Sequence, residues 1–307
     1  MFDKLEEYFA TLKVDKSVHT VRSYLNILNR FVEYFHIESI DDINKIGAKE
    51  IQDYLNLLAT QHINSDTTKE KIDSAKSTAN GHARVIKVFL NWLEAKKYII
   101  ATPFTKDIKK FKEAKTDKEF YNEEERDQII LACKKKLWLQ VTMALLFYTG
   151  LRREEAVNLK ISDFYGDHIL ATRKNNKQQK LYFPPFVGKL IDKYLSKRKD
   201  SCEYLLVSIR GQHQISDVSL GLRVKEACRL AGIEDERIKK TGAHTIRRSF
   251  ACILLLNGSS SFTIQQALGH SSPLVTERYV KPAMDLIAGK AMTKQNSPSW
   301  YDDNESE

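Results

Sequence analysis

The segment LGHSSPLVTERYV, residues 268–280, is the most informative stretch of this 307-residue chain. Leu268 and Gly269 are typical of a helix end, because glycine readily adopts the left-handed conformation that closes a helix. The Ser-Ser-Pro sequence that follows favours a turn, and residues 274–280 favour a new helix. Tyr279 would lie on that helix, nine residues after His270. By itself such a tyrosine is more readily interpreted as an amphipathic packing residue.

The segment HTIRRSFA, residues 244–251, places His244 and Arg247 three positions apart. In a helix this spacing puts both side chains on one face, where together they could bind an anion. An isolated pair of this kind is more often a capping histidine beside a solvated arginine. The pair therefore indicates a site only in combination with other segments.

The segment TGLRREEAVNL, residues 149–159, ends the apolar stretch WLQVTMALLFYTG and carries Arg152 and Glu155. Arg152 comes directly after a Thr-Gly-Leu turn that closes an apolar helix. A charge so close to a buried helix end is expected to face a cleft or to be paired, because an unpaired buried charge is costly. The alternative is a surface Arg–Glu pair worth a few tenths of a kcal/mol.

The stretch GDHILATRKNNKQQKLYFPP, residues 166–185, has β-forming residues on both sides of a polar KNNKQQ turn. This pattern predicts a β-hairpin or a small sheet. Lys174 lies in the turn, where a solvated lysine is the plain interpretation.

The first 100 residues predict a bundle of about four helices. Apolar residues recur at helical spacing in two stripes, which we interpret as core. Ser17 and Ser77 stand where N-caps would open the two striped helices, and Asp41 where one would open a short helix between them. The stripes are Tyr24, Leu28, Phe31 and Phe35, and Ile86, Phe89, Leu90 and Leu93.

Charge is distributed unevenly along the chain. Lys and Arg total 49 against 40 Asp and Glu, a formal charge of +9 with a pI near 9.1, which favours an anionic partner. Residues 1–105 are balanced, with 14 basic and 14 acidic side chains, whereas residues 119–293 carry 28 basic against 19 acidic. The excess therefore belongs to the middle and C-terminal parts.

These patterns predict two domains with a basic connection. Residues 106–118 contain six lysines against three acids after Pro103, which is typical of a solvated linker, and an exposed basic helix is the alternative. We expect a helical N-terminal domain at residues 1–105 and a mixed domain at 119–293. The acidic tail at residues 294–307 has the composition of a disordered segment.

Several classes of protein do not fit the sequence. No apolar run approaches the length of a membrane span, and the N-terminus lacks the pattern of a signal peptide, so we expect a soluble, cytoplasmic protein without a membrane partner. Its four cysteines are far apart and form no CxxC pair, which favours neither a zinc site nor a disulfide framework.

In this order and at these separations, the four segments resemble the tyrosine recombinase (integrase) family, above all its two-domain Xer-type recombinases. That family places an arginine in T-G-L-R-x-x-E, a lysine in a β-turn, the pattern H-x-x-R, and L-G-H followed nine positions later by tyrosine. Each pattern is weak alone, whereas the ordered set is highly specific. Residues 1–100 are similar to the family's helical core-binding domain, so the resemblance covers nearly the whole chain.

The resemblance implies a role for each matching residue. Two arginines would bind the phosphate, and a tyrosine would attack it and form a 3′-phosphotyrosyl intermediate. One histidine would assist removal of the tyrosine proton, the hairpin lysine would protonate the departing 5′-oxygen, and the second histidine would hydrogen-bond the scissile phosphate. In that order the implied residues are Arg152 and Arg247, Tyr279, His244, Lys174 and His270, with Glu155 as the supporting acid.

Two departures from the family pattern stand out. Many relatives have LRHTFA where this chain has IRRSFA, which places Arg248 at a position outside the catalytic set. The hairpin is one residue longer than usual, so Lys177 is a weaker candidate for the role given to Lys174.

The residue types suit phosphoryl transfer. Attack on a phosphodiester spreads negative charge over its oxygens, and arginine offers a planar, permanently charged fork that matches them. A phenol, with an unperturbed pKa of about 10, is both a tolerable nucleophile and a tolerable leaving group. Because the phosphotyrosine conserves the bond energy, neither a metal nor ATP is needed, and no P-loop sequence or carboxylate cluster is found.

Double-stranded DNA is the partner that the resemblance implies, with self-association into a dimer and a tetrameric synapse on DNA. Residues 281–292 predict a short helix with Pro282 near its start, which in relatives docks on a neighbouring subunit; packing within its own subunit is the alternative. Candidate DNA contacts lie on the last N-terminal helix and in the linker: Asn80, Arg84, Lys87, Lys109, Lys110 and Lys112.

The expected fold is mainly α with a small antiparallel β-sheet: an N-terminal helical bundle of the SAM-like core-binding type, followed by an α+β catalytic domain. The expected function is site-specific DNA recombination. Two alternatives remain at this point. One is a type IB topoisomerase-like enzyme that nicks and reseals one strand, and the other is a DNA-binding module that has lost catalysis.

Overall fold

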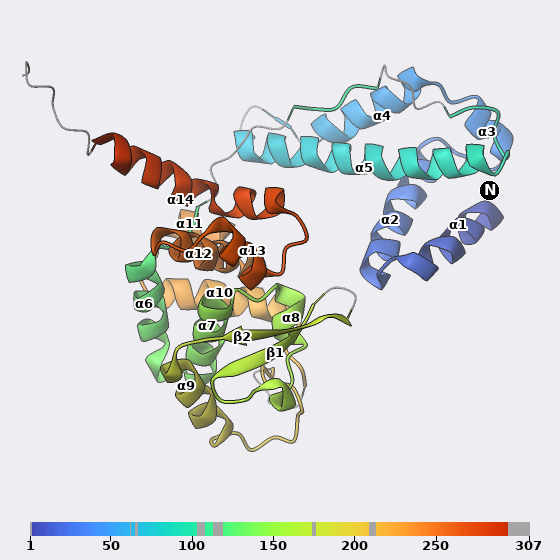
Figure 1. Ribbon diagram of the computed structural model, residues 1–307. Coiled ribbons are helices and arrows are strands. Elements are labelled where there is room, and N and C mark those ends of the chain that lie inside the picture. Colours follow the sequence, from blue (N-terminus) through green and yellow to red (C-terminus); the bar gives the residue numbers. More distant parts are fainter. Residues whose placement is uncertain are drawn as a thin grey trace, which may run out of the picture. The chain divides into compact units, whose positions relative to one another are not determined.

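A computed structural model describes residues 2–61, 63–64, 67–102, 108–112, 119–173, 176–208 and 213–293. Helices predominate in these ranges, and they contain one two-stranded antiparallel sheet (Figure 1). The contacts between Cα atoms divide the chain into two units, an N-terminal unit at residues 1–116 and a C-terminal unit at 117–307. The predicted fold class, mainly α with a small antiparallel sheet, is confirmed.

The N-terminal unit buries the two predicted apolar stripes. Leu28 and Phe31 of one helix, and Phe89 and Leu93 of another, are fully buried in its core. Three further helices complete the described part of this unit, one of them barely longer than a turn. In chain order the helices are α1 (Phe2–Asp15), α2 (Val18–Tyr34), α3 (Ile40–Asn44), α4 (Ala48–Thr60) and α5 (Lys69–Ala95).

Of the three predicted N-caps, only Ser17 is confirmed. Its Oγ accepts a hydrogen bond from the Thr20 backbone N–H at 3.3 Å. The prediction for Asp41 was wrong by two residues, because Ser39 is the N-cap of α3. The prediction for Ser77 was also wrong: α5 begins at Lys69, since the polar but helix-favouring residues before Ser77 extend the helix without adding to its apolar stripe.

Part of the predicted linker packs on the N-terminal unit. Ile108 and Phe111 lie against its core, and the Lys109 N–H donates to Gln52 Oε1 at 2.8 Å. The other residues of the predicted linker, and the predicted acidic tail, lie outside the described residues apart from Lys110 and Lys112. Within the described ranges, no helix combines the length and the apolar character that a membrane span requires.

The C-terminal unit is built around α7 (Leu137–Thr149), whose side chains are nearly all buried. This helix packs against α6, α9, α10 and α12 (Figure 1), which explains its continuous apolar sequence. The other helices of the unit are α6 (Glu123–Ala132), η1 (Cys133–Lys135), α8 (Arg153–Val157), η2 (Ile161–Asp163), α9 (Pro185–Leu195), α10 (Asp217–Leu230), α11 (Asp235–Lys240), α12 (Ala243–Leu256), α13 (Ser261–Leu268) and α14 (Pro273–Thr293).

The predicted hairpin is confirmed. Strands β1 (His168–Thr172) and β2 (Gln178–Tyr182) pair antiparallel, with Ile169 opposite Leu181. Beyond the last ladder pair, the Arg173 N–H donates to the Lys177 carbonyl at 2.7 Å. Lys174, which was assigned to the turn, lies outside the described residues.

The last helix differs from the prediction of two short helices. Helix α14 runs without interruption through Pro282, although proline lacks the N–H of a helical hydrogen bond. Its C-terminal half extends away from the other helices of the C-terminal unit (Figure 1). There the apolar side chains of Met284 and Ile287 are exposed rather than packed within the unit.

Candidate active site

The turn at Gly150 places Arg152 at the site. Helix α7 ends at Gly150, which has φ +58°, and a Cβ there would lie 2.4 Å from a ring carbon of Phe250. Both the left-handed backbone and the close approach therefore require glycine. Arg152 then caps α8, its backbone N–H donating to Glu155 Oε2 at 2.7 Å.

Glu155 is shared by three arginines. Its Oε1 accepts from Arg152 Nη1 at 2.8 Å, and its Oε2 accepts from Arg173 Nη1. Arg247 Nη1 lies 3.8 Å from the same Oε2. The carboxylate is almost completely buried, so these cations compensate its charge in place of water. The cluster carries a surplus of positive charge, which suits an additional anion.

Arg247 joins the ends of two helices. Its side chain, from α12, is 1% exposed. Nη1 donates to the Gly150 carbonyl at the end of α7, and Nη2 donates to the Leu268 carbonyl at the end of α13, at 2.6 Å. Burial lowers the pKa of Arg247, and the charge of Arg152 acts in the same direction. The network thus holds a guanidinium at one fixed place in the C-terminal unit.

His270 is held as a neutral imidazole. Its Nε2 lies 3.1 Å from Arg247 Nη2 and its Nδ1 lies 2.9 Å from Thr276 Oγ1. Because arginine can only donate, Nε2 accepts and Nδ1–H donates to Thr276. Burial, with the charges of Arg247 and Arg152, lowers the pKa of His270 to about 4. Both ring nitrogens are therefore bonded to protein.

Tyr279 points its hydroxyl at His244. The two groups lie 3.3 Å apart, measured from the phenol oxygen to His244 Nδ1. Burial and the charge of Arg247 lower the pKa of His244, which favours the neutral ring that can accept the phenol proton. The Tyr279 ring packs on a small apolar cluster formed with α12 and α13. The guanidinium carbon of Arg247 lies 5.9 Å from the centre of this ring, and that of Arg248 lies 6.0 Å from it.

The structure brings six of the seven predicted catalytic and supporting residues together. Arg152 Nη2 approaches the Gly269 carbonyl at 3.4 Å, which connects the α8 side of the site to the turn before α14. The seventh, Lys174, lies outside the described residues. The six are Arg152, Glu155, His244, Arg247, His270 and Tyr279.

The candidate DNA-contact residues differ in exposure and in their hydrogen bonds. Arg84 and Lys87 are exposed on α5. The Asn80 amide instead pairs with the backbone of Phe111 in both directions, at 3.0 Å each, which gives it a role in holding the chain after α5. Lys109, Lys110 and Lys112 are all exposed.

Sequence reasoning missed Arg173 and Thr276. Arg173 continues the inward alternation of β1, because Ile169, Ala171 and Arg173 are all buried. A charged residue on the inward face of a predicted strand was the signal that could have found it. Thr276 gave no such signal, since a buried hydroxyl cannot be told from an exposed one by helical spacing alone.

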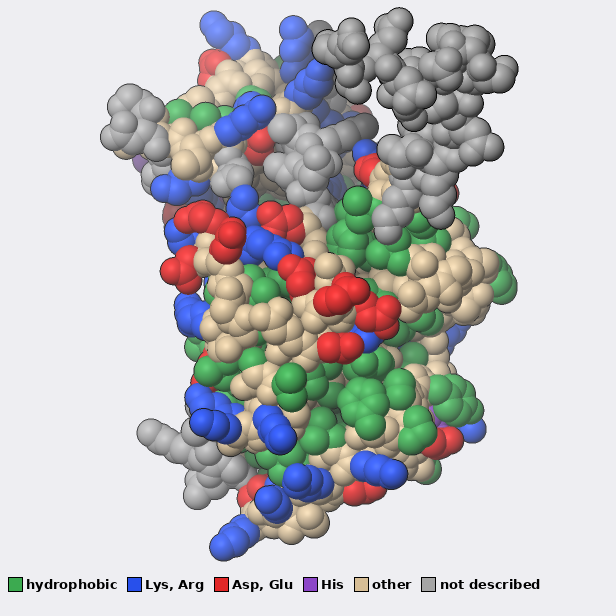
Figure 2. Space-filling model, turned by 90° about the vertical axis from the view of Figure 1, so that its left-hand side faces the viewer, with side chains coloured by type: hydrophobic (Ala, Val, Ile, Leu, Met, Phe, Trp, Pro, Cys, Tyr) green, Lys and Arg blue, Asp and Glu red, His purple; other side chains and the backbone are tan. Residues whose placement is uncertain are grey.

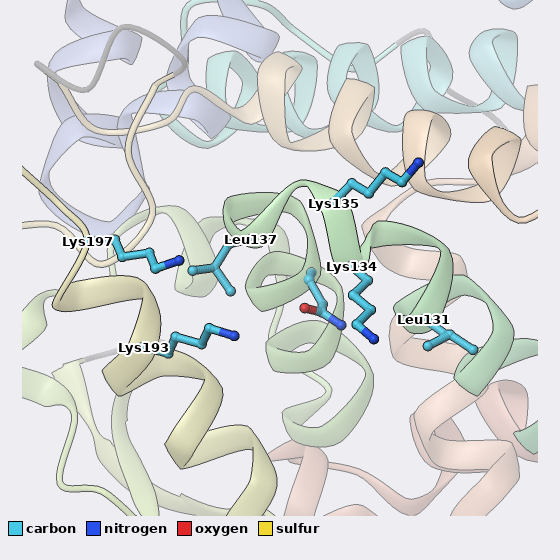
Figure 3. Close-up of a pocket in the computed structure, with 7 residues that line it drawn as sticks. Leu131, Lys134, Lys135, Leu137, Lys193 and Lys197 are labelled. Carbon is cyan, nitrogen blue, oxygen red and sulfur yellow. The ribbon is translucent and has the colours of Figure 1, made fainter.

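One pocket of the described surface lies away from this site. It has a volume of about 400 Å³, and its walls come from α6, η1, α7, α9 and the turn after α9 (Figure 3). Lys134, Lys135, Lys193 and Lys197 line it, and all four are exposed. On the face drawn in Figure 2, Lys and Arg side chains occur in small separate groups rather than as one continuous patch.

Comparison with known proteins gives the same assignment in both units. The pattern of the phage integrase family matches residues 119–285, and that of the phage integrase N-terminal SAM-like domain matches residues 5–77. Tyrosine recombinase XerC of Staphylococcus aureus (strain USA300 / TCH1516) is 27% identical over 290 residues, covering 89% of this chain and 90% of XerC.

Two solved structures share the fold. XerH recombinase in a post-cleavage complex with palindromic difH DNA has a TM-score of 0.70 at 18% identity, covering 94% of this chain and 83% of XerH. A lambda integrase tetramer bound to a Holliday junction has a TM-score of 0.66 at 16% identity, covering 91% of this chain and 76% of the integrase chain. Since the family pattern matches more than half of the sequence, the chain belongs to the phage integrase family of tyrosine recombinases.

Proposed function

We propose that this protein is a site-specific DNA recombinase that cleaves and rejoins strands through a 3′-phosphotyrosyl bond to Tyr279, without a metal or ATP. The observation that carries the proposal is the pairing of the Tyr279 hydroxyl with His244, beside the buried Arg247. A nucleophile, a proton acceptor and a fixed cation thus occupy one site.

In the proposed cleavage step, the phenol oxygen of Tyr279 attacks the scissile phosphorus while its proton passes to His244 Nδ1. The new P–O bond to tyrosine forms as the bond to the 5′-oxygen breaks, and Lys174 supplies the proton that leaves a free 5′-hydroxyl. Rejoining reverses each transfer. The phosphodiester is exchanged for another phosphodiester, so the step needs no external energy source.

Arg152 and Arg247 would stabilise the charge that develops on the non-bridging oxygens. Arg152 is the more available, because its side chain is about one third exposed and the hydrogen bond from its Nη2 to the Gly269 carbonyl is long, at 3.4 Å. Arg247 is held by carbonyl acceptors and by His270, so it offers a preorganised positive charge.

The substrate in this proposal is double-stranded DNA, held by a core-binding domain at residues 1–105 and a catalytic domain at 119–293 that a linker at 106–118 connects. Exposed cations on α5 and in residues 108–112 would contact the DNA backbone. Two structural relatives are bound to comparable partners: XerH to a palindromic difH substrate, and a lambda integrase tetramer to a Holliday junction. The exposed Met284 and Ile287 of α14 offer an apolar surface for dimer and tetramer contacts, and the working compartment would be the cytoplasm.

A suicide substrate tests the proposal. The scissile strand is nicked just downstream of the cleavage site, so that the released fragment diffuses away and traps the covalent complex. We expect wild type to form an adduct that retains a label at the 5′ end of the cleaved strand, and Tyr279→Phe to bind the same DNA without an adduct. Paired target sites should yield recombinants; relaxation of any supercoiled plasmid without recombinants would instead indicate a topoisomerase. Absence of an adduct from wild type would overturn the proposal.

A further inference from the structure

We propose that Arg173 is a positioning residue of this site, which fixes the Glu155 carboxylate and docks the β1–β2 hairpin against the phosphate-binding arginines. The inference rests on the proposed function of the site. It adds a residue that the family motifs described above do not contain, and it concerns a side chain that is almost completely buried.

Arg173 is buried, with 8% of its surface exposed, and all three of its guanidinium nitrogens are hydrogen-bonded. Nη1 donates to Glu155 on α8, Nε donates to Gln179 Oε1 on β2 at 3.0 Å, and Nη2 donates to the Ala267 carbonyl on α13 at 3.1 Å. One planar side chain therefore ties the hairpin to two helices that carry or adjoin the site.

The two oxygens of the Glu155 carboxylate accept hydrogen bonds from different donors. Oε1 accepts from the Arg152 head group, while Oε2 accepts from Arg173 and from the Arg152 backbone N–H. With Arg173 on Oε2, rotation of the carboxylate toward Arg247 would break a charge-assisted bond. Arg173 thus holds Oε1 in place for Arg152, and through Glu155 it sets the direction of a phosphate-binding side chain.

The turn at Gly269 lies in close contact with Arg173 and Gln179. A Cβ at Gly269 would lie 2.9 Å from Gln179 Oε1 and 3.3 Å from Arg173 Nε. The pair formed by Arg173 and Gln179 therefore packs directly against the turn that precedes His270. Gln179 Nε2 also donates to the Gln266 carbonyl at 2.7 Å, which gives the hairpin a second bond to the end of α13.

A test compares cleavage with binding in the full-length protein. We expect Arg173→Gln to lower the single-turnover rate of adduct formation on the suicide substrate by about 10- to 100-fold, because small errors of position cost that much. Its Kd for the same DNA should stay within about 3-fold of wild type. The rate of adduct formation by Arg173→Lys should lie between those of wild type and Arg173→Gln, since an ammonium keeps the charge but cannot reproduce the three hydrogen bonds of the guanidinium.

Arg198→Gln is the matched control. The side chain of Arg198, also in the C-terminal unit, is 7% exposed and pairs with Asp200 and with the carbonyls of Cys202 and Tyr204, none of which is a described residue of the site. Thermal unfolding of both glutamine variants measures the structural cost. We expect both to lose stability and only Arg173→Gln to lose cleavage rate per folded molecule. Equal effects of the two variants on cleavage would overturn the inference.

A double variant tests the route through Glu155. If Arg173 acts through that carboxylate, adding Arg173→Gln to Glu155→Gln should slow cleavage by less than about 3-fold further, because coupled residues are not additive. Full additivity would contradict the inference. Failure of the inference about Arg173 can be told from failure of the proposed function. If only the inference fails, wild type and Arg173→Gln form adduct at equal rates. If the proposed function fails, wild type forms no adduct.

Discussion

The same pair of side chains occurs in both units with different surroundings. In the N-terminal unit the Tyr54 hydroxyl lies 3.1 Å from His82 Nδ1, and in the C-terminal unit the Tyr279 hydroxyl lies 3.3 Å from His244 Nδ1. Burial lowers the pKa of both histidines. The hydrogen bond by itself therefore does not distinguish a core contact from a catalytic pair.

What differs is access and nearby charge. Tyr54 is 1% exposed among aromatic rings, and burial raises its pKa to about 12. Tyr279 is only half-buried, and two guanidinium groups, those of Arg247 and Arg248, lie beside its ring. Burial disfavours a phenolate in the first environment, whereas the second places two cations beside a partly exposed tyrosine ring.

The largest expected difference is between the two tyrosines. Tyr279→Phe should abolish covalent adduct formation on the suicide substrate, because no other group replaces the nucleophile. Tyr54→Phe should leave the rate of adduct formation within about 2-fold and cost about 1 kcal/mol of stability, the value of one hydrogen bond. Gel analysis of the adduct and chemical denaturation measure the two effects. An adduct that requires Tyr54 would contradict the assignment of Tyr279 as the nucleophile.

The second-largest difference in cleavage rate is expected between substitutions of the arginines near the two tyrosines. Arg247→Lys should slow adduct formation by about 10³-fold, since a lysine cannot keep the fixed fork at the site. Arg30, the cation that most lowers the pKa of Tyr54, provides the control. At saturating DNA, Arg30→Lys should cleave at the wild-type rate. The measurement is the single-turnover rate of each variant at saturating DNA.

Substitutions of the two histidines should differ less in their effect on the cleavage rate. His244→Asn should slow cleavage by about 10²-fold, whereas His82→Asn should not change it. Because the pKa of His244 is lowered from its ordinary 6.5, the wild-type rate should fall as the solution is acidified below pH 6.5, when the base becomes protonated. A rate profile of His244→Asn that kept this acid limb would show that another group accepts the proton.

The smallest effect is on stability against pH. His270 has its pKa lowered to about 4, so the unfolded chain binds its proton more readily than the folded protein. The contribution of His270 to the free energy of unfolding should therefore be fully present above pH 6.5. It should be lost as the pH falls toward 4, by about 3 kcal/mol at most. Denaturation of wild type and His270→Asn over this range measures it; equal slopes for the two proteins would contradict the assignment of a buried neutral imidazole.

Much of the fold was predictable because apolar spacing and turn residues are local signals. The stripes through Phe31 and Phe89, the apolar helix before Gly150 and the hairpin were all visible in sequence and are confirmed. The start of α5 and the continuity of α14 were not, since a polar helix segment and a proline within a helix both give the signals of a boundary.

The site was predictable only as an ordered set of motifs. Spacing put His244 and Arg247 on one helix face, but it could not show that the Gly150 and Leu268 carbonyls hold the arginine from two other helices. Contacts between residues far apart in sequence also explain why Arg173 was missed, because its partners come from α8 and α13.

The most direct measurement is the identity of the residue that carries DNA after trapping. Trypsin should release Tyr279 in the peptide YVKPAMDLIAGK, because Pro282 blocks cleavage after Lys281. After nuclease digestion of the adduct, mass spectrometry should find a nucleotide remnant on this peptide, attached to the tyrosine through its 3′-phosphate. A remnant on the peptide that contains Tyr54, or on any residue other than Tyr279, would contradict the account.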